Sequence, residues 1–269
     1  MREIIDAGPD AAVAEVEYLR LLGYPPGFVI EGRAAELAGQ ARAWYARHGR
    51  PWVYARRADR VDVSPSAVRI DGVAFTARRL RTMLQRTDAH AVMLVAAGAG
   101  PEIEAHAAAL WRDERPDEYF FHDVYGASVV EHLIAATGAR LCLWAEARRL
   151  GVLPHDSPGY AGWDISEQPR LLELLKTGCA PRAWPGPLEA LDSGALRPTK
   201  SQLAIFGLTC AVDRLDRRAG TLPCVDCLTE PCAYRRAPYT RSWGRAAAND
   251  AGAGDGVTSG GTARGRMRP

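Results

Sequence analysis

The sequence predicts an α+β fold. Helical and strand-like segments follow one another without the regular β-α alternation of a doubly wound protein. Two apolar runs, residues 89–97 and 202–212, have the length and composition of core strands. Asp71-Gly72 stands between two short apolar runs and is typical of a hairpin turn.

The first elements predicted are two helices. Residues 10–22 carry apolar side chains at helical spacing, which places four of them on one face: Val13, Val16, Leu19 and Leu22. A Pro-Pro-Gly segment, residues 25–27, ends this helix because proline cannot continue it. The second helix is expected over residues 34–48.

Strands are predicted next, over residues 52–58 and 67–75. Thr76 is in position to N-cap a helix of sequence TARRLRTMLQRT, because a threonine hydroxyl accepts hydrogen bonds from the first free backbone N–H groups. The apolar run 89–97 then leads through Gly98-Ala99-Gly100 into a helix over residues 101–111.

The longest helical pattern covers residues 117–150, either as one helix or as two pieces around Thr137-Gly138. A loop rich in proline and glycine follows over residues 155–163. Asp164 and Glu167 then form a capping-box pattern that opens the helix EQPRLLELLK.

Charge and hydropathy limit the classes of function that we expect of the chain. The chain has 34 basic and 32 acidic residues, so the balance gives no reason to expect nucleic acid as a partner. No apolar run reaches the roughly 18 residues that would span a membrane. The N-terminal segment MREIIDAGPD lacks the basic-then-apolar order of a secretory signal. We therefore expect a cytoplasmic protein with no membrane partner, whose cysteines are thiols or metal ligands rather than disulfides.

One domain is expected over residues 1–243, with a cysteine-rich segment at 224–232 near its end. Residues 244–269 contain almost no large apolar side chain and many glycines, which predicts a disordered tail.

The loop SPGYAGW, residues 157–163, has the composition of a ligand-contacting loop. Pro158 stiffens the backbone and Gly159 and Gly162 allow it to approach another surface closely. Tyr160 and Trp163 offer flat faces suited to a nucleotide base or a sulfonium cation. The alternative is a rigid loop that plugs the core with two aromatic side chains.

Four segments together resemble the activation-domain family of cobalamin-dependent methionine synthase. The segment SPGYAGWDISEQPRLLELL is similar to the P-G-Y segment of that family, and LEALDSGALRPTKS, residues 188–201, to its second signature. GAGPEIE, residues 98–104, resembles its strand–Gly–helix turn, and YGASVVE, residues 125–131, its glutamate-bearing helix. The resemblance covers residues 10–210 and implies a twisted mixed or antiparallel sheet flanked by helices.

The resemblance also implies site residues. The P-G-Y loop of that family contacts S-adenosylmethionine, a role that transfers to Ser157, Gly159 and Tyr160, while the helix glutamate corresponds to Glu131. A carboxylate there would pair with the ammonium or sulfonium of the ligand, although an exposed surface carboxylate explains Glu131 equally well. His155 occupies the position where the synthase has an arginine, and it is smaller and only partly charged near neutral pH.

By this resemblance, the chain is expected to present S-adenosylmethionine for the reductive methylation of an inactivated cobalamin. The cobalamin would be held by a corrinoid protein or cobalamin-dependent methyltransferase, and a flavodoxin-like or ferredoxin-like donor would supply the electron. No residue is a convincing general acid, base or nucleophile, so positioning would be the main task of the chain.

Cys224, Cys227 and Cys232 form a second constellation. Their C-x2-C-x4-C spacing is compact enough to bind one zinc ion or an iron–sulfur cluster, with Cys179 or Cys210 as a fourth ligand. A redox thiol pair and inert cysteines remain open. Two other functions therefore stay in view: a metal or redox protein built on this fold, and a non-catalytic binding or assembly protein.

Overall fold

A five-stranded antiparallel sheet forms the centre of the computed structural model, which describes residues 1–180 and 183–215. The strand order is β1-β2-β6-β10-β7, and every pairing in it is antiparallel. The strands are β1 (Glu3–Asp6), β2 (Trp52–Ala58), β6 (Ala89–Gly98), β7 (Gly151–Val152) and β10 (Ser201–Thr209). The predicted α+β fold with an antiparallel sheet is thereby confirmed.

Two smaller sheets lie beside this one. The first is a three-stranded meander of β3 (Val61–Val63), β4 (Val68–Ile70) and β5 (Val73–Phe75). Asp71 and Gly72 join its last two strands with φ angles of 48° and 90°, as the hairpin prediction requires. The second pairs β8 (Glu189–Ala190) with β9 (Leu196–Arg197).

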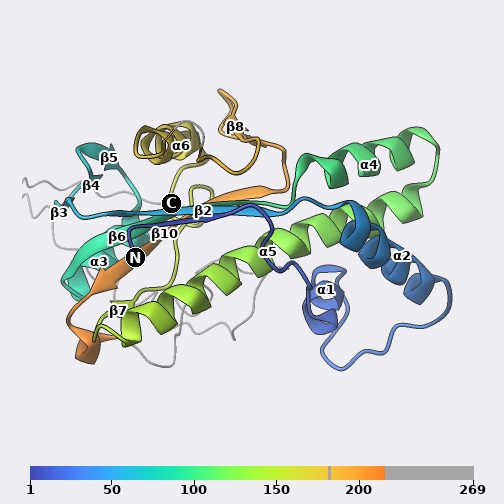
Figure 1. Ribbon diagram of the computed structural model, residues 1–269, viewed down its shortest axis with the longest axis horizontal. Coiled ribbons are helices and arrows are strands. Elements are labelled where there is room, and N and C mark those ends of the chain that lie inside the picture. The colour runs from blue at the N-terminus through green and yellow to red at the C-terminus, as the bar shows by residue number, and fades with distance from the viewer. Residues whose placement is uncertain (181–182, 216–269) are drawn as a thin grey trace, which may run out of the picture.

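Helices cover both faces of the central sheet (Figure 1). The long helix α5 runs along one face together with α1 and α2, while α6 lies over the other. The helices are α1 (Glu15–Leu21), α2 (Gly32–His48), α3 (Arg78–Arg86), α4 (Pro101–Arg112), α5 (Pro116–Glu146) and α6 (Gln168–Thr177). Two 3-10 turns, Ile165–Glu167 and Val212–Arg214, complete the described elements.

Strand β6 explains why both faces must be covered. Its sequence AHAVMLVAAG is apolar at nearly every position, and successive side chains point to opposite faces. Met93 and Val95 belong to the core cluster under α5, whereas Val92 and Leu94 belong to the cluster under α3 and α6. The sheet therefore separates two cores, which we call the α5 face and the α6 face.

Several predicted boundaries change in the structure. Residues 10–14 precede α1 rather than belonging to it, and Val16, expected on the apolar face, is 63% exposed. α5 is one continuous helix through Thr137 and Gly138, and the Thr137 hydroxyl is satisfied by donating to the Leu133 carbonyl (2.7 Å) within the helix. The last core strand ends at Thr209 instead of residue 212, because the chain turns there into a 3-10 segment.

Among the described residues, no helix is long and apolar enough to cross a membrane. The predicted cysteine site at Cys224, Cys227 and Cys232 and the predicted tail, 244–269, lie outside the described residues.

Candidate functional site

The P-G-Y loop continues the edge of the central sheet beyond β7. Leu153 donates its backbone N–H to the Gly207 carbonyl (2.9 Å), and Asp156 exchanges two backbone hydrogen bonds with Ile205 (3.0 and 2.9 Å). Residues 153–156 are thus held against β10 like an irregular extra length of β7. This pairing fixes where the following loop begins.

The loop itself consists of two consecutive tight turns. Tyr160 donates its N–H to the Ser157 carbonyl (3.0 Å), with Pro158 and Gly159 at the turn centre, and Trp163 repeats the pattern with the Tyr160 carbonyl (3.0 Å). Gly159 and Gly162 have φ angles of 92° and 86°, the conformation that a type II turn requires of its third residue. The predicted rigidity of the loop has a direct backbone cause.

Helix α3 anchors the loop from the other side. The helix begins after Ala77, whose side chain has no hydrogen-bonding atom to cap it. The loop provides the acceptors instead: the Gly162 carbonyl accepts from the N–H of Arg78 (3.0 Å), and Asp156 Oδ2 accepts from that of Leu80 (3.0 Å). The start of α3 and the P-G-Y loop therefore stabilise each other.

This arrangement corrects two capping predictions. Thr76 does not cap α3, because its N–H and hydroxyl both donate to the Glu167 carboxylate (3.1–3.2 Å). Asp164 does accept from the Ser166 N–H (2.8 Å), but it opens a 3-10 turn and α6 starts only at Gln168. Glu167 is occupied by Thr76 and by the indole N–H of Trp163 (2.7 Å), so it does not complete a capping box.

Asp156 is the buried charge of the loop. Its side chain is fully buried and pairs with Arg79 Nη1 (3.2 Å), which also donates to the His155 carbonyl (3.1 Å). Burial raises the pKa of Asp156 above its usual value, and Arg79 together with the N–H groups of Ser157 and Leu80 opposes that rise. Asp156 was not recognised in the sequence, where nothing local marks it as a distant helix cap.

Three of the predicted site residues form one polar cluster with Gln202. Gln202 Nε2 donates to Ser157 Oγ (3.1 Å) and to Tyr160 Oη (3.0 Å), and His155 Nε2 lies 3.2 Å from the same Tyr160 oxygen. His155 and Ser157 are buried, whereas Tyr160 is partly exposed. The cluster thus links the hydroxyl of the partly exposed Tyr160 to the buried His155 and, through Gln202, to the buried Ser157.

The polar cluster lies on the α5 face of the sheet. Gln202 has the same orientation along β10 as Phe206, which belongs to the core under α5, and the His155 ring packs against Phe206 (5.3 Å between centroids). Gln202 was missed in the sequence because it was taken as the first residue of an apolar strand. Gln202 is spaced two and four residues from Ala204 and Phe206, so its side chain lies on the same face of the strand, and this spacing was the available signal.

The remaining expected residues have different surroundings. Gly159 forms the exposed tip of the first turn. Glu131 is partly buried on α5, eight residues beyond Asp123, whose carboxylate pairs with Lys200 Nζ (2.8 Å) at the start of β10. Glu131 therefore belongs to the helix that covers the same face as the polar cluster. Trp163 is only 2% exposed and packs edge-on against Phe75, so it is a core plug rather than a ligand surface.

The described cysteines do not build a metal site. Cys210 is exposed with its Sγ 3.8 Å from His90 Nδ1, and Cys179 is partly buried elsewhere on the molecule. Within residues 1–180 and 183–215, no three or more histidine, cysteine or acidic side chains gather to hold a metal ion.

Comparison with known proteins supports the fold. The sequence matches no protein-family model and none of the curated proteins searched. Among solved structures, the crystal structure of the MetH reactivation domain bound to AdoHcy matches with a TM-score of 0.54 and 13% sequence identity over 77% of each chain. At this identity the likeness shows a shared fold across most of the described residues.

Proposed function

We propose that this chain binds S-adenosylmethionine at the P-G-Y loop and acts as an accessory protein in the reductive reactivation of a corrinoid partner. The observation that carries the proposal is the polar cluster of His155, Ser157, Tyr160 and Gln202 on one edge of β10. The structural neighbour with the same fold is a reactivation domain that binds AdoHcy, the demethylated product of S-adenosylmethionine.

The chemistry of the loop suits such a ligand. Tyr160 combines a partly exposed aromatic side chain, of a kind that can stack on a base or face a sulfonium cation, with a hydroxyl fixed by Gln202. Gly159 is exposed at the turn and carries no side chain of its own, and Ile165 lies within ordinary van der Waals distance, 3.7 Å from where an added Cβ would stand. A ligand can therefore approach the loop backbone closely, and Glu131 supplies a carboxylate on the same face for its ammonium group.

In this role the residues of the chain bind and orient. The methyl donor would be held with its sulfonium directed away from the protein, toward a cobalamin carried by the partner, and an electron donor of flavodoxin or ferredoxin type would act on the partner. The contribution to the rate is positional, because fixing two reactants in an attack geometry removes a large entropic cost.

Calorimetric titration of the full chain with S-adenosylmethionine tests the binding step. We expect saturable binding that weakens at least about tenfold in Tyr160→Ala and less in Tyr160→Phe, which keeps the ring. Tyr24→Ala is the matched control, since Tyr24 is also partly exposed but stacks on Phe28, remote in sequence from the loop. Equal affinity in the Tyr160 and Tyr24 variants would remove the loop from the binding site.

A second experiment separates binding from reactivation. The chain is mixed with a cob(II)alamin-loaded corrinoid protein, a low-potential reductant and S-adenosylmethionine, and methylcobalamin formation is followed by its absorbance. Acceleration that depends on Tyr160 supports the full proposal. Binding without acceleration by any corrinoid protein tried would limit the function to nucleotide binding.

A further inference from the structure

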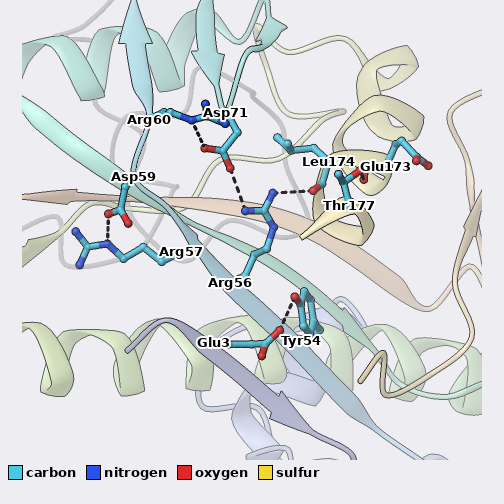
Figure 2. A network of polar contacts seen from close by, with 10 residues as sticks. All are labelled: Glu3, Tyr54, Arg56, Arg57, Asp59, Arg60, Asp71, Glu173, Leu174 and Thr177. Carbon is cyan, nitrogen blue, oxygen red and sulfur yellow. Dashed lines mark hydrogen bonds and ion pairs between the residues drawn. The ribbon is translucent and has the colours of Figure 1, made fainter. Parts of the chain in front are cut away.

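A hollow lies on the α6 face of the sheet, the face opposite the polar cluster. It has a volume of about 450 Å³ and opens between the β4–β5 hairpin and α6. Three arginines line it, Arg56 from β2, Arg60 from the turn before β3 and Arg170 from α6, together with Asp71 and Glu173. Figure 2 shows Arg56 reaching from β2 toward both the hairpin and α6.

Arg56 forms the fixed base of this hollow. Its side chain is only 10% exposed, with Nη1 paired to Asp71 (3.1 Å) and Nη2 donating to the Leu174 carbonyl (2.7 Å). Within the described residues, the buried Arg56 Nε atom has no hydrogen-bond partner. It lies against Gly178, where any side chain would collide with it. Arg56 therefore contributes a fixed positive charge at the base of the hollow, held in place by Asp71 and the Leu174 carbonyl.

The other two arginines have donors to spare. Arg60 is 80% exposed, and its Nε lies 3.5 Å from the Asp71 carboxylate. Arg170 is 55% exposed and uses Nη1 for the Ala74 carbonyl (2.9 Å), with Glu167 at 3.8 Å. Since a guanidinium has five N–H donors, most donors of Arg60 and Arg170 remain available within the described part of the chain.

The charges of the lining favour an anion. Three arginines face two carboxylates, and Asp71 is already shared between Arg56 and Arg60. Arg170 lies in the first turn of α6, the positive end of the helix, whereas Glu173 lies one turn further along. The attractive part of the hollow is thus its Arg60–Arg170 side, and Glu173 would repel a second negative group.

We propose that this hollow binds a single oxyanion group, a phosphate or a carboxylate, between Arg60 and Arg170 and above Arg56. The planar fork of a guanidinium matches two oxygens of either group, which explains why arginine is frequent at such sites. The site is separate from the P-G-Y loop, so it stands whether or not the chain binds S-adenosylmethionine.

Amide NMR titration of the full chain with inorganic phosphate, at constant ionic strength set by sodium chloride, tests the proposal. We expect saturable shifts for residues 71–74 and 173–178. The double variant Arg60→Gln/Arg170→Gln should weaken binding at least about tenfold, the equivalent of losing one or more charge-assisted hydrogen bonds. Arg56 is left unchanged because its contacts hold the hairpin to α6.

The matched control removes two charges elsewhere. Arg47→Gln/Arg50→Gln changes two exposed arginines at the end of α2 and should leave phosphate binding intact. Non-saturating shifts, or equal weakening in both double variants, would overturn the proposal and reduce the effect to unspecific ion association. A parallel titration with acetate separates the sources: tighter binding of acetate assigns the site to carboxylates, and tighter binding of phosphate assigns it to phosphate groups.

Discussion

Replacing Asp156 with alanine tests whether the P-G-Y loop and the start of α3 form one unit. The change removes the acceptor of the Leu80 N–H and the carboxylate that pairs with Arg79, a side chain only 12% exposed. Removing one member of a buried ion pair costs roughly 3–5 kcal/mol, because the remaining charge and the orphaned donor stay buried. We expect a loss of that size in the free energy of unfolding, measured by equilibrium urea denaturation of the full chain.

Two comparisons make the result specific. Asp156→Asn keeps an oxygen for the Leu80 N–H but removes the charge that pairs with Arg79, so it should cost less than Asp156→Ala. Asp164→Ala removes an exposed cap from a 3-10 turn and should cost least. Hydrogen exchange at the Leu80 amide should speed up in Asp156→Ala only. If Asp156→Ala is no more costly than Asp164→Ala, the loop does not hold the start of α3 and the argument fails.

The pH dependence of the unfolding free energy provides an independent test of the role of Asp156. Because burial raises the pKa of Asp156 above 3.8, the folded state holds this proton more tightly than the unfolded state does. The stabilising contribution of Asp156 is then complete below pH 3.8 and decreases as the pH rises through the folded-state pKa. The stability of the wild type relative to Asp156→Asn should therefore fall as the pH is raised from acid toward neutral values.

Three further predictions concern other parts of the fold. Gly178→Ala should destabilise the protein by about 1–3 kcal/mol in the same denaturation assay, because the new methyl group displaces Arg56. Gly39→Ala, in open space on α2, should instead stabilise it by up to about 1 kcal/mol. Burial lowers the pKa of His122 below 6.5, so the unfolding free energy should decrease as the pH falls below that value, and His122→Gln should reduce this slope. Tyr18→Phe should cost about 1–2 kcal/mol in thermal or urea unfolding, because it leaves a buried carbonyl without its 2.7 Å hydrogen bond.

The parts of the fold that follow local patterns could be predicted from the sequence. β6 was found because an unbroken apolar run marks a strand buried on both faces, and the Asp71-Gly72 hairpin because its residues tolerate positive φ angles. β7 was missed because two residues, Gly151 and Val152, carry no periodicity. β1 was missed because only Ile4 of its four residues is buried.

The partners of polar side chains could not be predicted in the same way. Thr76 has the chemistry of an N-cap and the correct position before a helix, yet its hydroxyl donates to Glu167, ninety-one residues away. Asp156 performs the capping instead, from the far side of the loop. For the candidate site, the resemblance supplied His155, Ser157 and Tyr160, which the structure brings together, but their link through Gln202 depends on the register of β10. The roles of these residues toward a nucleotide stay predictions.

The place of β10 in the sheet has a consequence for synthesis of the chain. β10 lies between β6 and β7, so the hydrogen-bonding edge of β6 that faces away from β2 has no neighbour until residues 201–209 have left the ribosome. During that interval a long, uncharged strand edge is open to pairing with other chains. Newly made chains should therefore be most vulnerable to aggregation, and most dependent on chaperones, before β10 is complete. Growth temperature and synthesis rate should consequently affect the yield of folded protein more than the stability of the finished fold would suggest.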